Sequence, residues 1–269
     1  MMARRVEMLA SNSLAGRRFT VTGAGTGIGR AIALRLAALG ATVGGMGRRE
    51  EPLQETLSMA GPGRFVPLPC DIRDYEAAAR VMATFAEGGL DGLVNNAGGQ
   101  FYAAASDISV NGFSAVVDLN LTALFALTTA AQPYLAQSGG AIVNMSIVGA
   151  ERGALGLAHA VAARSGVAGL SKALALEWGA DRIRVNSIAI GTVETESFRA
   201  ATAESLRRDL ADQSPVPRLV DAAEVAELTA FLLSDAAEMI TGQTLRLDGG
   251  AFLAGPIDMR PAKKDVMHE

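Results

Sequence analysis

The sequence predicts an α/β protein built on one doubly wound parallel sheet of seven strands, with helices on both faces. Short β-branched runs alternate with longer amphipathic stretches along the chain, as expected where buried parallel strands are joined by helical crossovers. A glycine-rich turn also follows the first of these β-branched runs. The chain has 269 residues, of which 49% are apolar, and this length and composition suit a single large core.

The strands are expected at seven short runs that are rich in β-branched or other apolar residues. In chain order these runs are 19–22, 41–43, 65–68, 92–95, 141–145, 183–188 and 244–247. Helices are expected in the intervals. The first interval has apolar residues at positions 28, 32, 36 and 39, which form one helical stripe. Asp74 and Asp221 are predicted N-caps for helices at 75–87 and 222–233.

One domain is predicted at 16–254, with an N-terminal extension at 1–15 and a C-terminal tail at 255–269. The two ends lack a helical or strand period, so we expect them outside the sheet. No internal repeat divides the chain, and no linker rich in Pro, Gly or Ser does so either.

Composition excludes several kinds of chemistry. Cys70 is the one cysteine, so neither an intrachain disulfide nor a CxxC site can form, and a reducing cytoplasmic setting is expected. Only His159 and His268 are histidines, which rules out a three-histidine metal site, and no metal is predicted. The net charge of −4 and the absence of long basic runs argue against a nucleic-acid partner. No apolar core of signal-peptide length follows the charged start of the chain.

A long uncharged stretch runs from Leu119 to Ala150. Its many interrupting Asn, Gln, Thr, Ser, Gly and Pro residues distinguish it from the more uniformly apolar segments that span membranes. We interpret it as buried elements of a core, and no membrane partner is expected.

The glycine-rich turn, TGAGTGIG at 22–29, lies where the first strand gives way to the first helix. Glycine lets a backbone approach a pyrophosphate, and the free N–H groups of a helix N-terminus bind its charge. Glycine also serves ordinary turns, but the strand-to-helix context favours a dinucleotide site of the Rossmann type. The predicted contacts are Gly23, Thr26, Gly27, Ile28 and Gly29.

The residues about twenty positions after the last glycine of this turn report the type of dinucleotide, since an acid there binds the ribose 2′-hydroxyl whereas Arg accepts a 2′-phosphate. Arg48 and Arg49 occupy this place, and no acid occurs between Val43 and Arg49. NADP(H) is therefore predicted over NAD(H). The alternative is that the two arginines form only a solvated start to a helix.

The Asn95-Asn96-Ala97-Gly98 run, together with the spacing of the glycine turn, resembles the short-chain dehydrogenase/reductase superfamily from about Gly16 to Phe252. The resemblance implies that Asp71 and Ile72 contact adenine and that Asn120 holds a proton-relay water. It implies a catalytic role for Ser146. Further cofactor contacts implied in this way are Asn96, Ala97, Gly98, Gly191, Val193 and Thr195, although Ile190 stands where the family usually has Pro. Residues 194–217 resemble the family's substrate-covering loop.

The superfamily's Tyr and Lys, which move the proton and grip the nicotinamide ribose, are missing. Alignment on the run from Gly166 to Lys172 places Ala160 at the Tyr position and Arg164 at the Lys position. Ala160 can transfer no proton. Arg164 can bind ribose hydroxyls and supply charge, but it does not readily give up a proton. Lys172 lies past the site, at the end of its helix, and is not included.

Two segments narrow the resemblance. NNAGGQF at 95–101 and HAVAARSGVAGLSKALALEW at 159–178 are similar to the peroxisomal trans-2-enoyl-CoA reductases and, more distantly, to the 2,4-dienoyl-CoA reductases. The resemblance implies hydride delivery from NADPH to a carbon conjugated with a thioester carbonyl. Such a reaction requires stabilisation of an enolate and protonation at carbon, for which a hydrogen-bond donor is needed but a phenolate base is not.

Several groups are candidates for the donor. Ser146 can bond the thioester oxygen, or it can merely cap its strand. His159 exchanges protons near neutral pH, although a lone histidine is often a packing residue. Tyr102 is interpreted as a pocket wall. Tyr75 and Tyr134 are placed on surface-side helices, and Cys70 is interpreted as a buried apolar residue.

The predicted activity is reduction of the C=C bond of an enoyl thioester by NADPH. A carbonyl reductase with an unusual proton donor and an NADPH-binding pseudoenzyme are the alternatives. The helix at 158–178 is apolar over much of its circumference, and relatives pair such helices, so a homodimer or homotetramer is expected. The charged residues of 194–217 are interpreted as a solvated helix face. The chain ends without an SKL-type peroxisomal address.

Overall fold

The structure, a computed structural model, describes residues 9–253. Its sheet has seven strands in the order β3-β2-β1-β4-β5-β6-β7, and every neighbouring pair is parallel. The strands are β1 Arg18–Thr22, β2 Thr42–Gly47, β3 Phe65–Pro69, β4 Gly92–Asn95, β5 Ala141–Ile147, β6 Arg184–Ile190 and β7 Thr244–Leu247. The predicted seven-stranded, doubly wound parallel sheet is confirmed.

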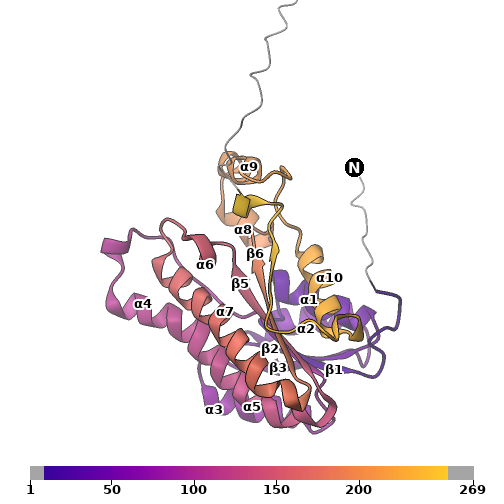
Figure 1. Cartoon of the computed structure of the whole chain (residues 1–269). Helices are drawn as coiled ribbons and strands as arrows, with labels where there is room; N and C mark the ends of the chain where they lie inside the picture. The colour runs from indigo at the N-terminus through magenta and orange to yellow at the C-terminus, as the bar shows by residue number, and fades with distance from the viewer. Residues whose placement is uncertain (1–8, 254–269) are drawn as a thin grey trace, which may run out of the picture.

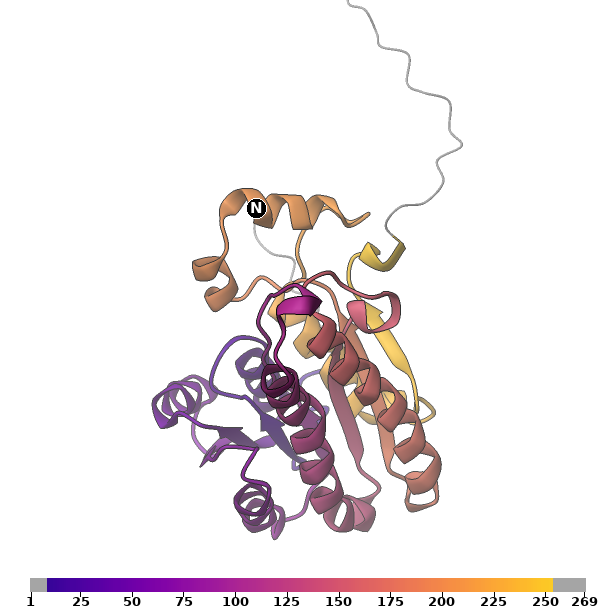
Figure 2. The same cartoon turned by 90° about the vertical axis from the view of Figure 1, so that its left-hand side faces the viewer.

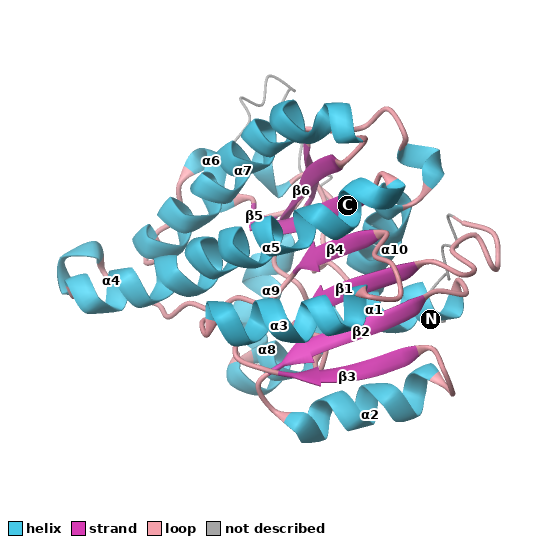
Figure 3. Cartoon of the chain, turned by 90° about the horizontal axis from the view of Figure 1, so that it is seen from below, coloured by secondary structure: helices cyan, strands magenta, loops and turns pink. Residues whose placement is uncertain are grey.

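Helices cover both faces of the sheet, as Figure 3 shows from below. One face carries α1 Gly27–Ala38, α2 Glu50–Ala60 and α10 Ala222–Leu233, whose buried side chains join one core cluster. The other carries α3 Tyr75–Ala86, α4 Val110–Val117, α5 Ala123–Ser138 and α7 Ala158–Trp178. Side chains of α3, α5 and α7 build the second core cluster on that side.

Three further helices lie beyond the carboxyl ends of the strands. They are α6 Gly149–Arg152, α8 Glu196–Ala201 and α9 Glu204–Asp212. Figures 1 and 2 show α8 and α9 standing above the body of the molecule. The region predicted as a substrate-covering loop at 194–217 therefore contains two helices and projects over the end of the sheet where parallel α/β proteins bind their ligands.

Both predicted N-caps are present. The Asp74 carboxylate accepts a hydrogen bond from the N–H of Ala77 at 3.0 Å and starts α3. Asp221 accepts from the N–H of Ala223 at 2.9 Å, and Glu224 completes a capping box at the start of α10. A cap supplies a partner for an N–H that the first helical turn leaves unpaired. These local rules explain why two helix starts are readable in the sequence.

The second strand is longer than predicted and runs to Gly47. Gly44 and Gly45 have no apolar side chains, so a pattern based on side chains does not predict this part of the strand. Packing nevertheless requires glycine at both positions. A Cβ on Gly44 would stand 2.9 Å from the ring of Phe85, and one on Gly45 would overlap the ring of Phe65. At the amino end, Leu14 lies outside the sheet but is fully buried in the core. Residues 1–8 of the predicted extension and the predicted tail at 255–269, with His268, lie outside the described residues.

Within residues 9–253, one helical run, Val110–Ser138, is long and apolar enough to cross a membrane by length and composition. It comprises α4, α5 and a π-helical turn, Asp118–Thr122, between them. Its buried side chains Ala123, Leu127, Ala131 and Leu135 belong to the second core cluster. This packing agrees with the interpretation of the uncharged stretch as part of the core.

Candidate active site

A cleft of about 360 Å³ opens at the carboxyl ends of the strands, where β1 and β4 lie side by side and the strand order reverses. Ligands of doubly wound sheets bind at this switch point because the loops after the two strands diverge there. Most of the predicted cofactor residues line the cleft. They are Gly23, Thr26, Gly27, Ile28, Gly29, Arg48, Arg49, Asp71, Ile72, Asn96, Ala97, Gly98 and Thr195.

Thr22, the last residue of β1, holds the two loops of the cleft together. Its hydroxyl oxygen accepts hydrogen bonds from the N–H groups of Asn96 and Ala97, each at 2.9 Å. The side-chain amide of Asn96 donates back to the carbonyl of Thr22 at 2.9 Å. The loop after β4 is thereby tied to the start of the glycine turn. Sequence reasoning included Thr22 in the motif but gave it no role of its own.

The glycine turn has the shape that a pyrophosphate requires. Gly23 and Gly27 have φ values of +68° and +52°, which L side chains rarely adopt. A Cβ on Gly23 would approach the Asn96 amide nitrogen to 2.9 Å. The turn feeds directly into the N-terminus of α1, whose first N–H groups and dipole favour an anion. The residues present therefore fit the diphosphate of a dinucleotide.

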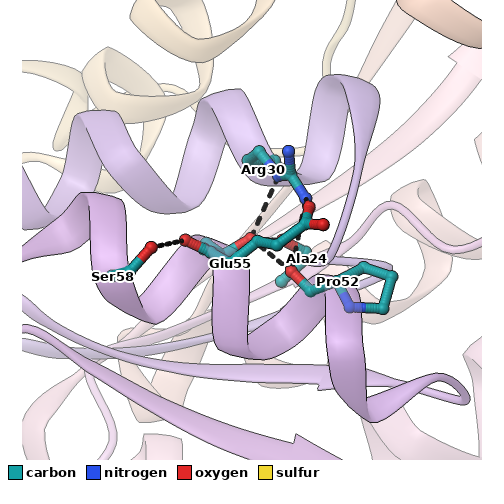
Figure 4. Close-up of polar contacts among 6 residues, drawn as sticks. Ala24, Arg30, Pro52, Glu55 and Ser58 are labelled. Atoms are coloured by element: carbon teal, nitrogen blue, oxygen red, sulfur yellow. Dashed lines mark hydrogen bonds and ion pairs between the residues drawn. The ribbon is translucent and has the colours of Figure 1, made fainter.

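The wall of the cleft formed by α2 is fixed to the glycine turn (Figure 4). Arg30 of α1 donates to the Thr56 hydroxyl at 3.2 Å and pairs with Glu55. The Thr56 hydroxyl in turn bonds the carbonyl of Ala24 at 3.1 Å. These contacts hold α2 in place immediately after Arg48 and Arg49. No pattern in the sequence indicated them, because they join residues on two different helices.

Arg48, Arg49 and Asp71 all line the cleft, and Arg48 is close enough to Asp71 for their charges to interact. The Arg73 side chain grips both oxygens of the Asp71 carboxylate, at 3.1 Å and 2.6 Å. This hydrogen bonding is the main cause that lowers the pKa of Asp71, and Arg48 lowers it further through its charge. The carboxylate is therefore ionised at neutral pH and able to accept hydrogen bonds. Arg48 and Arg49 supply positive charge to this part of the cleft.

Cys70 lies beside Asp71 and lines the same cleft, half-buried rather than fully enclosed. Burial, with a smaller contribution from the negative charge of Asp71, raises the pKa of its thiol to about 11. The thiol is protonated at neutral pH and is a poor nucleophile. The interpretation of Cys70 as a non-nucleophilic residue agrees with this, but the residue faces the cleft and is not part of a closed core.

Asn120 occupies the π-helical turn between α4 and α5 and is 1% exposed. Its amide donates to the carbonyls of Gly99 and Val116, both at 2.8 Å, and its oxygen accepts from the N–H of Gly99 at 3.3 Å. The wider turn allows one side chain to bond the helix and the loop after β4 together. Asn120 therefore fixes the loop that carries Asn96 to Gly98.

Arg164 reaches from α7 to the same loop. Its Nη1 donates to the carbonyl of Met145 at 2.6 Å. A Cβ on Gly98 would overlap Nη2 of Arg164 and stand 2.6 Å from the Asn120 oxygen, so the guanidinium and the amide converge beside this glycine. Burial lowers the pKa of Arg164 to about 10. The guanidinium is still charged at neutral pH, and Gly98 is the residue that leaves room for it.

Ser146 is 3% exposed on β5, and its hydroxyl donates to the backbone carbonyl of Arg164 at 3.3 Å. Ala160 is 1% exposed, one helical turn before Arg164. Ser146 and Arg164 are thus brought together across β5 and α7. Neither lines the open cleft.

His159, at the second position of α7, has no exposed surface. Its Nδ1 accepts the N–H of Ala160 at 2.8 Å. The ring of Phe101 packs against it edge to face, with centroids 4.3 Å apart. Tyr102, next along the loop, is 74% exposed and is not a wall of the cleft. Phe101 was not among the predicted site residues, since nothing in its spacing indicated a histidine partner.

Only some of the predicted cofactor contacts that follow β6 line the cleft. Gly191 and Val193 follow β6 but do not line the cleft, whereas Thr195 does and also caps α8 through the N–H of Phe198 at 3.2 Å. Glu194, which lies between Val193 and Thr195, forms ion pairs with Arg199 of α8 and Arg207 of α9, each at 3.3 Å. The charged residues of this segment are therefore partly paired with each other.

Tyr75, Tyr134 and Lys172 do not line the cleft. The Tyr75 hydroxyl bonds the carboxylate of Asp118 on the outside of the molecule, which raises the pKa of the phenol. Tyr134 packs against the second core cluster. Lys172 is exposed, and it lies within α7 rather than at its end as expected. Among residues 9–253, no group of three His, Cys, Asp or Glu side chains is placed to hold a metal ion.

A family model described as enoyl-(acyl carrier protein) reductase matches residues 23–251. A probable 2,4-dienoyl-CoA reductase of Bacillus subtilis is 36% identical over 242 residues, which cover 87% of this chain and 95% of that protein. A peroxisomal 2,4-dienoyl-CoA reductase of Arabidopsis thaliana is 34% identical, with coverage of 90% and 86%.

Solved structures are similar over most of the chain. The 3-oxoacyl-[acyl-carrier protein] reductase of Brucella melitensis superimposes with a TM-score of 0.87 at 31% identity, covering 94% of this chain and 99% of the other. A putative short-chain alcohol dehydrogenase of Sinorhizobium meliloti gives a TM-score of 0.84 at 37% identity, covering 91% and 100%.

Proposed function

Because this chain belongs to the short-chain dehydrogenase/reductase family of oxidoreductases, we propose that it is an NADPH-dependent reductase of the C=C bond in α,β-unsaturated acyl thioesters. Members of the family use nicotinamide cofactors and act on small molecules. One observation carries the proposal. On the buried side of α7 the site presents Ala160 and the guanidinium of Arg164, and neither can supply the proton that alcohol and ketone interconversion requires.

The choice of NADPH rests on Arg48 and Arg49. Both line the cleft beyond the end of β2, where the adenosine ribose of a dinucleotide lies in this fold. Guanidinium groups bind phosphate through charge-assisted, often bidentate hydrogen bonds. Arg49 is the N-cap residue of α2 and is exposed, so it can turn toward a 2′-phosphate. NADP(H) is accordingly the proposed cofactor.

The residues have distinct proposed roles. When bound, NADPH supplies a hydride to the β-carbon of the enoyl group. Arg164 binds the nicotinamide ribose hydroxyls beside Gly98, and Asn120 holds the loop that shapes this position. Ser146 orients the thioester carbonyl once its weak 3.3 Å bond to the Arg164 carbonyl is exchanged for a substrate oxygen. Charge that develops on the enolate oxygen is stabilised by fixed donors and by the Arg164 cation.

We further propose that the active form is a homodimer or homotetramer in the cytoplasm. Apolar side chains are exposed on the helices of one face, with Leu176 of α7 at 86% and Phe125 of α5 at 46%. Isolated exposed side chains are common, but two on neighbouring helices that cover the same face support pairing of that face with a second copy. Sedimentation of the wild-type chain tests the stoichiometry.

The experiment compares matched substrates. NADPH oxidation is followed with trans-2-enoyl-CoA and with 3-oxoacyl-CoA of the same chain length, with NADPH binding measured separately. Turnover of the enoyl thioester, with the ketone at least 100-fold slower, is expected. A preference for the ketone would identify a carbonyl reductase, in keeping with relatives named acetoacetyl-CoA reductase and 3-oxoacyl-[acyl-carrier-protein] reductase. NADPH binding without turnover of either would identify a pseudoenzyme.

A further inference from the structure

The hydrogen bonding of His159 determines which of its nitrogens carries a proton. Its Nδ1 accepts the backbone N–H of Ala160 at 2.8 Å. Ala160 is the third residue of α7, where N–H groups have no carbonyl partner in the helix. A ring nitrogen that accepts a hydrogen bond carries no proton, so the neutral ring bears its proton on Nε2. An imidazolium would instead direct an Nδ1–H at the Ala160 N–H.

The other nitrogen is left without a partner. Nε2 of His159 is buried and makes no hydrogen bond to any of the described residues. A buried donor without an acceptor costs roughly 1–3 kcal/mol, and such groups are rare in folded proteins. Phe101 packs edge to face on the imidazole at 88° and offers it no oxygen. The polar end of His159 is therefore prepared to donate to a group that residues 9–253 do not provide.

The covering residue belongs to the loop that also forms the cofactor cleft. Gly98 lines the cleft, and Phe101 follows three residues later. The loop is joined to the segment before α7 by the hydrogen bond from Ala103 N–H to the Gly156 carbonyl at 3.2 Å. Phe101 is 41% exposed while His159 has no exposed surface, so the ring lies on the solvent side of the histidine. A shift of Phe101 would uncover the imidazole beside the loop that carries Gly98.

This proposal rests on the function proposed above. We propose that the ring of His159 is held neutral and donates its Nε2–H to the acyl oxygen of the thioester substrate. The hydride forms a bond at the β-carbon, the C=C electron pair moves onto the carbonyl oxygen, and that oxygen accepts the hydrogen bond. As the carbonyl re-forms, the α-carbon takes a proton from water, and His159 keeps its own. This role differs from that of a general acid, which would require the imidazolium. A neutral imidazole can act as an electrophile in this manner.

Two substitutions test separately the roles of Nε2 and Nδ1 of His159. The amide nitrogen of His159→Gln reaches as far as Nε2 and can donate there, whereas His159→Asn places an amide oxygen near Nδ1 and lacks the distal donor. We expect His159→Gln to keep kcat within about tenfold of wild type. His159→Asn should lower kcat by about 10²–10³, the loss typical for one oxyanion donor. NADPH affinity should be unchanged in both. An Asn variant as active as wild type, or a Gln variant as slow as Asn, would overturn the proposal.

A measurement that leaves His159 in place keeps the test independent of the folding of the His159 variants and of turnover. The chain has only two histidines, so ¹⁵N imidazole NMR needs only His268→Gln for assignment. The expected spectrum of His159 is that of a neutral ring protonated at Nε2, and its Nε2–H signal should move when NADP⁺ and a saturated acyl-CoA are added. A ring protonated at Nδ1, an imidazolium, or an unmoved signal would contradict the proposal. Absence of enoyl turnover alongside the expected spectrum would contradict the proposed function alone.

Discussion

Replacement of Arg164 by Met should affect the stability of the protein and its affinity for the cofactor differently. Burial lowers the pKa of this guanidinium well below its ordinary value, to about 10. The lowering corresponds to about 3 kcal/mol by which the folded state disfavours the charged form. Because the folded pKa is the lower one, this cost is fully present at neutral pH and is relieved only as the pH rises through about 10.

One contact offsets this cost. The hydrogen bond from Nη1 to the Met145 carbonyl, at 2.6 Å, is charge-assisted and contributes about 1.5–3 kcal/mol. Arg164→Met removes both the cost of burying the charge and the hydrogen bond to Met145. It keeps a long side chain at a position where Arg164 is 7% exposed. The free energy of unfolding of the apo protein should therefore stay the same or rise by up to about 2 kcal/mol.

The same variant should bind NADPH ten- to a hundredfold more weakly, since it loses one or two charged hydrogen bonds to ribose hydroxyls. Urea unfolding of the apo protein and titration of NADPH fluorescence measure the two quantities. Lys172→Met is the matched control, because it removes a cation from an exposed position on the same helix, and it should change neither. Unaltered NADPH affinity in Arg164→Met, or a loss of more than about 2 kcal/mol in apo stability, would refute this reasoning.

Two sets of substitutions and one labelling reaction test other parts of the site. Arg48→Ala with Arg49→Ala should weaken NADPH binding about 10–100-fold and leave NADH binding unchanged, and equal effects on both cofactors would exclude 2′-phosphate recognition. Thr22→Val should lower the free energy of unfolding by about 2–4 kcal/mol, because the N–H groups of Asn96 and Ala97 lose their acceptor, whereas Thr22→Ser should not. The Cys70 thiol, with its pKa raised to about 11, should be alkylated slowly at pH 8, faster as the pH approaches 11, and more slowly still with NADPH bound. Mass spectrometry of the intact chain measures the rate of alkylation. Rapid alkylation at neutral pH would contradict the assigned burial of Cys70.

The elements that the sequence predicts correctly are those set by local rules. Asp74 and Asp221 start their helices through bonds to N–H groups two or three residues away. The cleft likewise assembles from motifs that each follow the end of a parallel strand, and parallel strands end at the same edge. The predicted end of the second strand was wrong because Gly44 and Gly45 have no side chains to alternate. Glycine is required at these positions because a Cβ would collide with the rings of Phe85 and Phe65, which are distant in sequence.

The parts of the site that sequence alone did not predict depend on long-range packing. Arg164 was expected to contact ribose, but its convergence with Asn120 beside Gly98 joins α7, the π-helical turn and the loop after β4. His159 was a candidate donor by virtue of its chemistry and its place beside Ala160. Only the tertiary structure shows that Nδ1 is occupied and that Phe101 covers the ring.

In the proposed reaction, hydride from NADPH ends on the β-carbon of an enoyl thioester. NADPH that carries deuterium at both C4 positions, incubated with crotonyl-CoA in ordinary water, shows where the hydride goes. The expected product is butyryl-CoA with one deuterium, located at C3 by mass spectrometry. Absence of labelled butyryl-CoA, together with a deuterated 3-hydroxybutyryl-CoA formed from acetoacetyl-CoA under the same conditions, would contradict the proposed reaction and identify a carbonyl reductase.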